Sequence, residues 1–191
     1  MAASVVVVLL AIGATAWWWT SRDKGTSAVA VPERICGGTL PGKEVAALLP
    51  KEGDEFKEKL DLDFISTSNS WCGVTAGGSY IDFDYWWDRS EAWTEELTKE
   101  SKKSGNTPIE LGATKGYASG RGATLFVDCP SESGLKKQVK VQVTLMYQAQ
   151  PDSEKPQTDF AALVGDATRY VAKQLKCEGA ARLPGEVPTV G

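Results

Sequence analysis

An alternation of polar and apolar residues in the middle of the chain restricts its fold more than any other feature. Residues 80–87 read YIDFDYWW. Because successive side chains of a strand point to opposite sides of a sheet, one face would carry Ile81, Phe83, Tyr85 and Trp87, and the other Tyr80, Asp82, Asp84 and Trp86. Residues 139–147 alternate in the same way. The two segments predict an antiparallel sheet with one face in the core and one face in water.

Shorter patterns predict the elements around this sheet. Helices are expected at 43–49, 55–60, 88–104 and 158–175, where apolar residues recur at helical spacing or a capping residue precedes the run. Strands are expected at 64–74, 109–117 and 123–128, with glycine turns at 76–78 and 120–122. The expected fold class is therefore α+β, an antiparallel sheet meander packed by N- and C-terminal helices.

An uncharged apolar run opens the chain. Residues 4–19, SVVVVLLAIGATAWWW, approach the length of about 20 residues that a helix needs to cross a bilayer. We expect a transmembrane anchor with its tryptophans at the lipid headgroups, and the alternative is a signal segment cleaved near Ala16, which would leave the domain secreted. The expected organisation is an anchor or signal at 1–20, a linker at 21–34, one domain at 35–179 and a flexible tail at 180–191.

The basic residues near this run and the cysteines favour opposite orientations. Arg22 and Lys24 follow the run and would place the domain in the cytoplasm by the positive-inside rule. Four dispersed cysteines favour an oxidising compartment instead. A start codon upstream of Met1 that adds a basic segment would reconcile the two. The expected location is the cell membrane, with a single span and the domain facing outside.

The cysteines predict two disulfides. They are Cys36, Cys72, Cys129 and Cys177. None forms a C-x-x-C pair, so neither a zinc site nor a thioredoxin-like motif is indicated. Four reduced core thiols in a cytosolic protein are the alternative to a disulfide framework.

The expected topology selects one of the three possible pairings. If the first helix packs antiparallel to the strand that follows it, Cys36 at the helix start lies beside Cys72 at the strand end. A later strand ends at Cys129, and the final helix runs back to end at Cys177 on the same side of the sheet. The predicted disulfides are therefore Cys36–Cys72 and Cys129–Cys177.

Composition narrows the function. The chain has no histidine, which is the commonest general base and zinc ligand. Its net charge is −4 and it has no basic stripe, which argues against nucleic acid as a partner. No phosphate-binding loop or metal-ligand motif stands in the sequence. We therefore expect a protein that is not an enzyme and has neither a cofactor nor a bound metal.

The polar face of the strand at 80–87 is the expected ligand-binding surface. Its candidate residues are Tyr80, Asp82, Asp84 and Trp86. An aromatic ring can stack on a sugar ring, and a carboxylate can accept hydrogen bonds from sugar hydroxyls. Two carboxylates at alternate positions of one strand lie about 7 Å apart, which falls within the range of an inverting glycosidase. A solvated strand face whose acids prevent edge pairing is the plain structural interpretation.

The order of cysteines and elements resembles a known family. A cysteine beside the first helix, another in Ser70-Trp71-Cys72-Gly73, a third in a late strand and a long final helix are similar to the actinobacterial cell-surface lipoproteins of unknown function, small secreted domains with a PsbP/Mog1-like fold. The resemblance covers about residues 35–180 and implies an extracytoplasmic, non-enzymatic role in sensing or binding. Those lipoproteins carry a lipidated cysteine directly after the apolar segment, whereas the first cysteine here is Cys36, so the apolar helix would replace the lipid.

Together these features predict a membrane-anchored envelope protein that binds without catalysis. Its expected partners are the membrane, through residues 4–19, and a cell-wall component or an envelope protein. One alternative is a cell-wall glycoside hydrolase that uses Asp82 and Asp84. The other is a purely structural or assembly protein.

Overall fold

A computed structural model describes residues 27–64, 68–130, 136–146, 153–177, 183 and 185–191 of the chain. The helices in these residues are α2 (Lys43–Leu48), α3 (Ser90–Glu100) and α4 (Pro156–Gln174). The longer strands are β5 (Lys57–Asp61), β6 (Asn69–Ala76), β7 (Ser79–Arg89), β8 (Thr107–Leu111), β9 (Thr114–Ser119), β10 (Gly122–Pro130) and β11 (Lys136–Met146). Two-residue strands are β1 (Ser27–Ala28), β2 (Arg34–Ile35), β3 (Leu40–Pro41), β4 (Glu52–Gly53) and β12 (Thr189–Val190).

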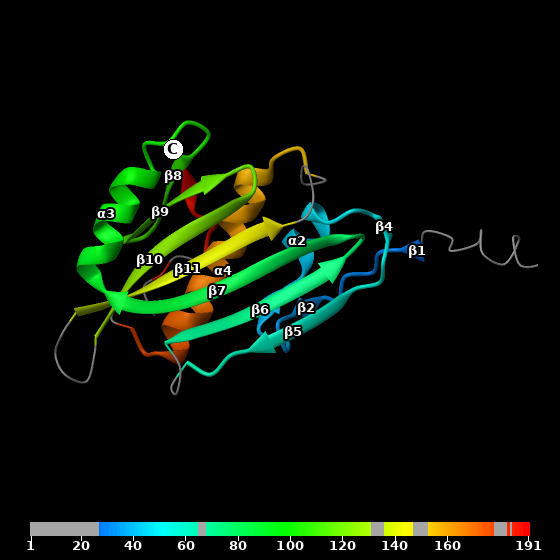
Figure 1. The fold of residues 1–191 in the computed structure, drawn as a ribbon, viewed down its shortest axis with the longest axis horizontal. Coiled ribbons are helices and arrows are strands. Elements are labelled where there is room, and N and C mark those ends of the chain that lie inside the picture. The colour runs from blue at the N-terminus through cyan, green and yellow to red at the C-terminus, as the bar shows by residue number, and fades with distance from the viewer. Residues whose placement is uncertain (1–26, 65–67, 131–135, 147–152, 178–182, 184) are drawn as a thin grey trace, which may run out of the picture.

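An eight-stranded antiparallel sheet organises the molecule (Figure 1), with the strand order β12-β8-β9-β10-β11-β7-β6-β5. The predicted α+β class is therefore confirmed at this level. The sheet consists of two meanders, β5-β6-β7 and β8-β9-β10-β11, which join where β11 pairs with β7. The helix α3 leaves the end of β7 and starts the second meander, so the sheet is not the single meander that the sequence predicted.

The two faces of the sheet have different covers. We call the side with Ile81, Phe83 and Tyr85 the core face, because these three side chains are fully buried. The helix α4 packs on this face, with α2 beside it, and both lie behind the sheet in Figure 1. The opposite side, which we call the outer face, is covered only in part, by α3 over β9, β10 and β11. Within the part of the chain that the structure describes, the other half of the outer face, on β5, β6 and β7, is uncovered except at the end of β7, from which α3 continues.

Both predicted disulfides are present. Cys36 is bonded to Cys72, and Cys129 to Cys177, with Cα–Cα distances of 5.7 and 4.3 Å. The first bond ties the turn before β3 to the core face of β6, and the second ties the end of β10 to the residues after α4. Loops that close over 36 and 48 residues are long enough for each bond to stabilise the fold by about 4 kcal/mol on the loop-entropy account.

Two predicted elements differ from the structure. Residues 57–61 form the edge strand β5, not the short helix predicted at 55–60. The Glu58 carboxylate accepts hydrogen bonds from the backbone N–H groups of Cys36 and Gly37, at 2.7 and 3.3 Å, which holds this segment extended against the neighbouring turn. The strand predicted at 109–117 is divided into β8 and β9 by a tight turn in which Gly112 has φ of 61°. Glycine adopts this backbone conformation without steric cost, so the chain can reverse there.

The segments expected as linker and tail contribute short strands at the two ends of the described chain. The range predicted as a linker contains β1 and the first residue of β2, which pair with β4 and β3 in the predicted domain. In the range predicted as a flexible tail, β12 pairs with β8 at the sheet edge. Pro188 packs directly on the backbone of Gly165, and the Arg169 guanidinium donates to the carbonyl of Glu186 at 3.1 Å. These contacts position β12 against α4.

The predicted membrane anchor at residues 4–19 lies outside the described residues. Within the residues that the structure describes, no helix has the length and apolar character needed to cross a membrane.

Candidate functional site

The alternation in β7 places all four predicted site residues on the outer face. Tyr80, Asp82, Asp84 and Trp86 are each partly buried, and Ile81, Phe83 and Tyr85 between them are fully buried. The prediction of their position is thus confirmed. β7 pairs with β6 on one side and with β11 on the other, and this regular pairing keeps successive side chains on opposite faces of the sheet. Their role in binding remains a prediction.

Neighbouring strands add residues that sequence reasoning did not single out. On β6, Trp71 stands opposite Asp84 and Gly73 opposite Asp82. On β11, Lys140 stands opposite Trp86. Trp71 was predictable, because Cys72 faces the core and the residue before it in a strand must face the other way. The position of Lys140 was not, because it depends on the pairing of β7 with a strand that is far away in the sequence.

The two aspartates interact with each other and with Tyr80. The Tyr80 hydroxyl donates to Asp82 Oδ1 at 3.1 Å. Partial burial raises the pKa of Asp84 to about 6, the Asp82 charge adds to this increase, and Lys140 opposes it. Burial also raises the pKa of Asp82, although its hydrogen bonds with Tyr80 and Asp84 oppose the change.

The interaction between the two aspartates agrees with their alternate positions on β7. Side chains at alternate positions of a strand start about 7 Å apart, and each of these two changes the pKa of the other.

The ammonium group of Lys140 fastens α3 to the outer face. Its Nζ lies 2.6 Å from Glu96 Oε1, on α3, and 5.2 Å from the ring centroids of both Trp86 and Trp93. The Tyr117 hydroxyl donates to the same Glu96 oxygen at 3.2 Å, and burial raises the pKa of this tyrosine to about 12. This cluster marks the border of the region of the outer face that α3 covers.

Tyr80 lies over a glycine on the neighbouring strand. A Cβ atom built on Gly73 would lie 2.3 Å from the Tyr80 hydroxyl oxygen and 2.7 Å from Cζ. The absence of a side chain at Gly73 therefore creates the space that the phenol occupies, a packing used in sheets to cover glycine backbone. The hydrogen bond to Asp82 fixes the ring in this position.

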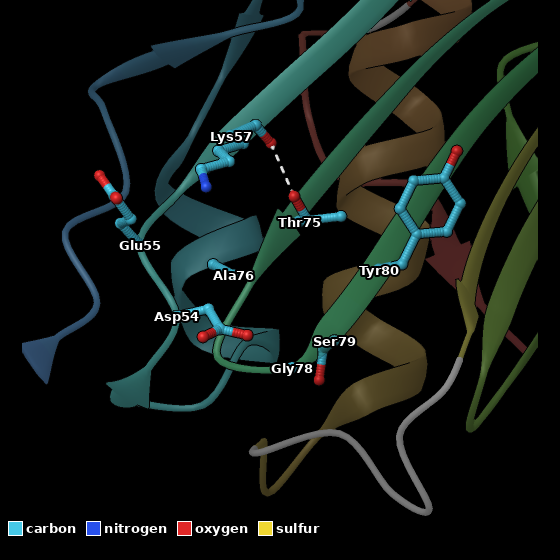
Figure 2. Close-up of a pocket in the computed structure, with 8 residues that line it drawn as sticks. All are labelled: Asp54, Glu55, Lys57, Thr75, Ala76, Gly78, Ser79 and Tyr80. Carbon is cyan, nitrogen blue, oxygen red and sulfur yellow. Dashed lines mark hydrogen bonds between the residues drawn. The ribbon is translucent and has the colours of Figure 1, made fainter. Parts of the chain in front are cut away.

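A hollow of about 710 Å³ opens next to Tyr80, at the end of the β6–β7 hairpin (Figure 2). Its lining residues are Asp54, Glu55, Lys57, Thr75, Ala76, Gly78, Ser79 and Tyr80. Figure 2 shows that they come from the segment before β5, from β5 itself and from both strands of the hairpin. Tyr80 lines the hollow and is also the first residue of the row Tyr80, Asp82, Asp84 and Trp86, so the hollow adjoins that row.

The described residues contain no group of three or more histidine, cysteine, aspartate or glutamate side chains that could hold a metal ion. All four cysteines are used in the two disulfides.

Comparison with protein-family models, with curated proteins and with solved structures found no match for this chain.

Proposed function

We propose that this chain is a membrane-anchored envelope protein that faces outside and binds a cell-wall glycan on the uncovered half of its outer face. The observation that carries the proposal is the composition of that half. Two indoles, Trp71 and Trp86, and the phenol of Tyr80 share this face with Asp82 and Asp84, and within the described residues α3 reaches only its border, beside Trp86. Two disulfides agree with an oxidising compartment.

Glycan is the ligand class that this mixture of groups suits best. The ring C–H groups of a sugar pack on aromatic rings, and its hydroxyls both donate and accept hydrogen bonds. The carboxyl groups of Asp82 and Asp84 offer acceptor oxygens to such hydroxyls and repel an anion, so they favour an uncharged polyhydroxylated ligand.

Binding without catalysis is the form of the proposal that we favour, because the sequence has no histidine to serve as a general base. Hydrolysis by Asp82 and Asp84 would need their carboxyl groups to lie on either side of a glycosidic bond. A purely structural or assembly role needs no ligand on this face, and the binding experiment separates it from the proposal.

Replacement of one indole tests the proposal. Trp86→Ala should weaken binding of the full-length protein to purified peptidoglycan at least tenfold, because a buried aromatic contact contributes more than about 1.4 kcal/mol. The matched control is Glu110→Ala with Lys115→Ala, an exposed pair 3.6 Å apart on β8 and β9, which should bind like the wild type.

Three other results would count against the proposal. Unchanged binding in Trp86→Ala would move the site away from this face. Failure of the wild type to bind any wall glycan would favour the assembly role. Release of soluble muropeptides, abolished by Asp82→Asn, would identify a hydrolase. Thermal unfolding of each variant checks that the fold is intact.

A further inference from the structure

The hollow beside Tyr80 has walls that the backbone holds in place. Gly53 and Gly77 approach so closely that a Cβ on Gly53 would lie 2.7 Å from the Cα of Gly77. The N–H of Gly77 donates to the carbonyl of Asp54 at 2.9 Å. Pairing of β1 with β4 adds a second support behind this segment. The segment before β5 is therefore fastened to the tip of the hairpin, and the hollow between them is a built feature of the fold.

Tyr80 provides an aromatic wall. Its ring lies over Gly73, and its hydroxyl is held by Asp82 at 3.1 Å, so the ring has little freedom to turn. The residue is only partly buried, and its accessible part borders the hollow. A fixed aromatic ring at the edge of a cavity is a surface on which the apolar side of a sugar can stack.

The other walls mix donors with acceptors. Asp54 and Glu55 offer carboxylate oxygens, Lys57 offers an ammonium group, and the Thr75 hydroxyl donates to the Lys57 carbonyl at 3.4 Å. The ion pairs found among the described residues do not include Asp54, Glu55 or Lys57. The two carboxylates repel an anionic ligand. The ammonium group next to them makes the hollow less attractive to a cationic ligand than two carboxylates alone would be. Hydroxyl groups, which both donate and accept, match all three side chains.

We infer that this hollow is a subsite for one pyranose ring of an uncharged glycan. The ring stacks on Tyr80, and its hydroxyls bond to Asp54, Glu55 and Lys57. The inference rests on the proposed function, whose site continues along β7 from Tyr80 to Trp86. Six residue steps of a strand cover about 20 Å, so a chain of several sugar rings, rather than a single sugar, would span both ends.

A comparison of glycans of two lengths tests the subsite. The probes are the N-acetylglucosamine disaccharide and tetrasaccharide, titrated calorimetrically into the full-length protein. The wild type should bind the tetrasaccharide at least tenfold more tightly than the disaccharide. Lys57→Met and Asp54→Asn should each reduce that ratio to about threefold or less, and Tyr80→Ala should abolish it. Gly73→Ala, whose added methyl displaces the Tyr80 ring, should act like Tyr80→Ala.

Lys43→Met is the matched control. Lys43 is an exposed lysine at the start of α2, which lies on the other side of the sheet, so this variant should keep the full ratio. An unchanged ratio in Lys57→Met, Asp54→Asn and Tyr80→Ala, with binding still weakened by Trp86→Ala, would overturn the subsite and leave the proposed function standing. Failure of both saccharides to bind the wild type would overturn the two together. Lys57→Met and Asp54→Asn change exposed side chains, so they keep the test decisive if Gly73→Ala does not fold.

Discussion

At the scale of single residues, the sequence placed the side chains of β7 correctly but not their interactions. The alternation at 80–87 put Asp82 and Asp84 on the same face, and pairing in the sheet confirmed this. It did not indicate that the Tyr80 hydroxyl would donate to Asp82. The Tyr80 ring can take that position because the neighbouring strand has a glycine beneath it. A glycine within a strand pattern is the one local signal that could have pointed to this close approach.

The carboxyl pair predicts how stability changes with pH. The pKa of Asp84 rises from 3.8 to about 6 on folding, so between these values the folded protein holds a proton that the unfolded chain has released. The contribution to stability is fully present below pH 3.8 and is lost as the pH rises through about 6. The free energy of unfolding should therefore fall across this window by about 1 kcal/mol more in the wild type than in Asp84→Asn, after allowance for partial exposure.

Urea unfolding at pH values from 4 to 7 measures this difference. Asp61 is an exposed acid on β5 that lies on the same outer face as Asp84. Asp61→Asn is therefore the control and should follow the wild-type curve. Parallel curves for the wild type and Asp84→Asn would show that the pair does not hold a proton in solution.

At the scale of elements, long periodic segments were predictable and short charged ones were not. The strands β7 and β11 and the helix α4 were expected near their observed positions, because each buries one regular apolar stripe. The segment at 57–61 reads KEKLD, and all five of its side chains are exposed, so no apolar pattern distinguished a strand from a helix. Pairing with β6 decides its conformation, and this is a tertiary effect.

The attachment of α3 to the sheet can be tested with two ion pairs of equal length. Lys140–Glu96 and Lys103–Glu100 both measure 2.6 Å, but the Lys140 side chain is 13% exposed and that of Lys103 is 55% exposed. Lys140→Ala should lower the free energy of unfolding by about 1.5–3 kcal/mol, because it leaves Glu96 partly buried with only the hydrogen bond from Tyr117. Lys103→Ala should cost less than about 0.5 kcal/mol, since exposed pairs contribute little.

Chemical denaturation of the two variants provides the comparison. Equal losses of stability would mean that burial of the Lys140 cluster does not strengthen the contact between α3 and the sheet.

At the scale of the whole molecule, a coarse topology was enough to choose the disulfides. For Cys129–Cys177 the argument from the ends of elements agrees with the structure. The pairing Cys36–Cys72 is also correct, but Cys36 lies in the turn before β3 and Cys72 lies inside β6, so the expected helix start and strand end are not what brings them together. The joining of two meanders through β7 and β11 was not predictable, because no local pattern specifies which strand pairs across a helical insertion. That same junction brings Lys140 to Trp86, so the candidate site was only partly visible in the sequence. The uncovered half of the outer face is a property of the complete fold.

The most direct measurement of the central claim is an indole N–H titration by NMR. Tryptophan signals of the ¹⁵N-labelled full-length protein, assigned with single Trp→Phe variants, would be followed as the N-acetylglucosamine tetrasaccharide is added. Trp71 and Trp86 lie on the outer face, and Trp87, which packs against the core, is the internal reference. We predict saturable shifts of the Trp71 and Trp86 signals and a stationary Trp87 signal. Stationary Trp71 and Trp86 signals at saturating saccharide would contradict glycan binding on this face.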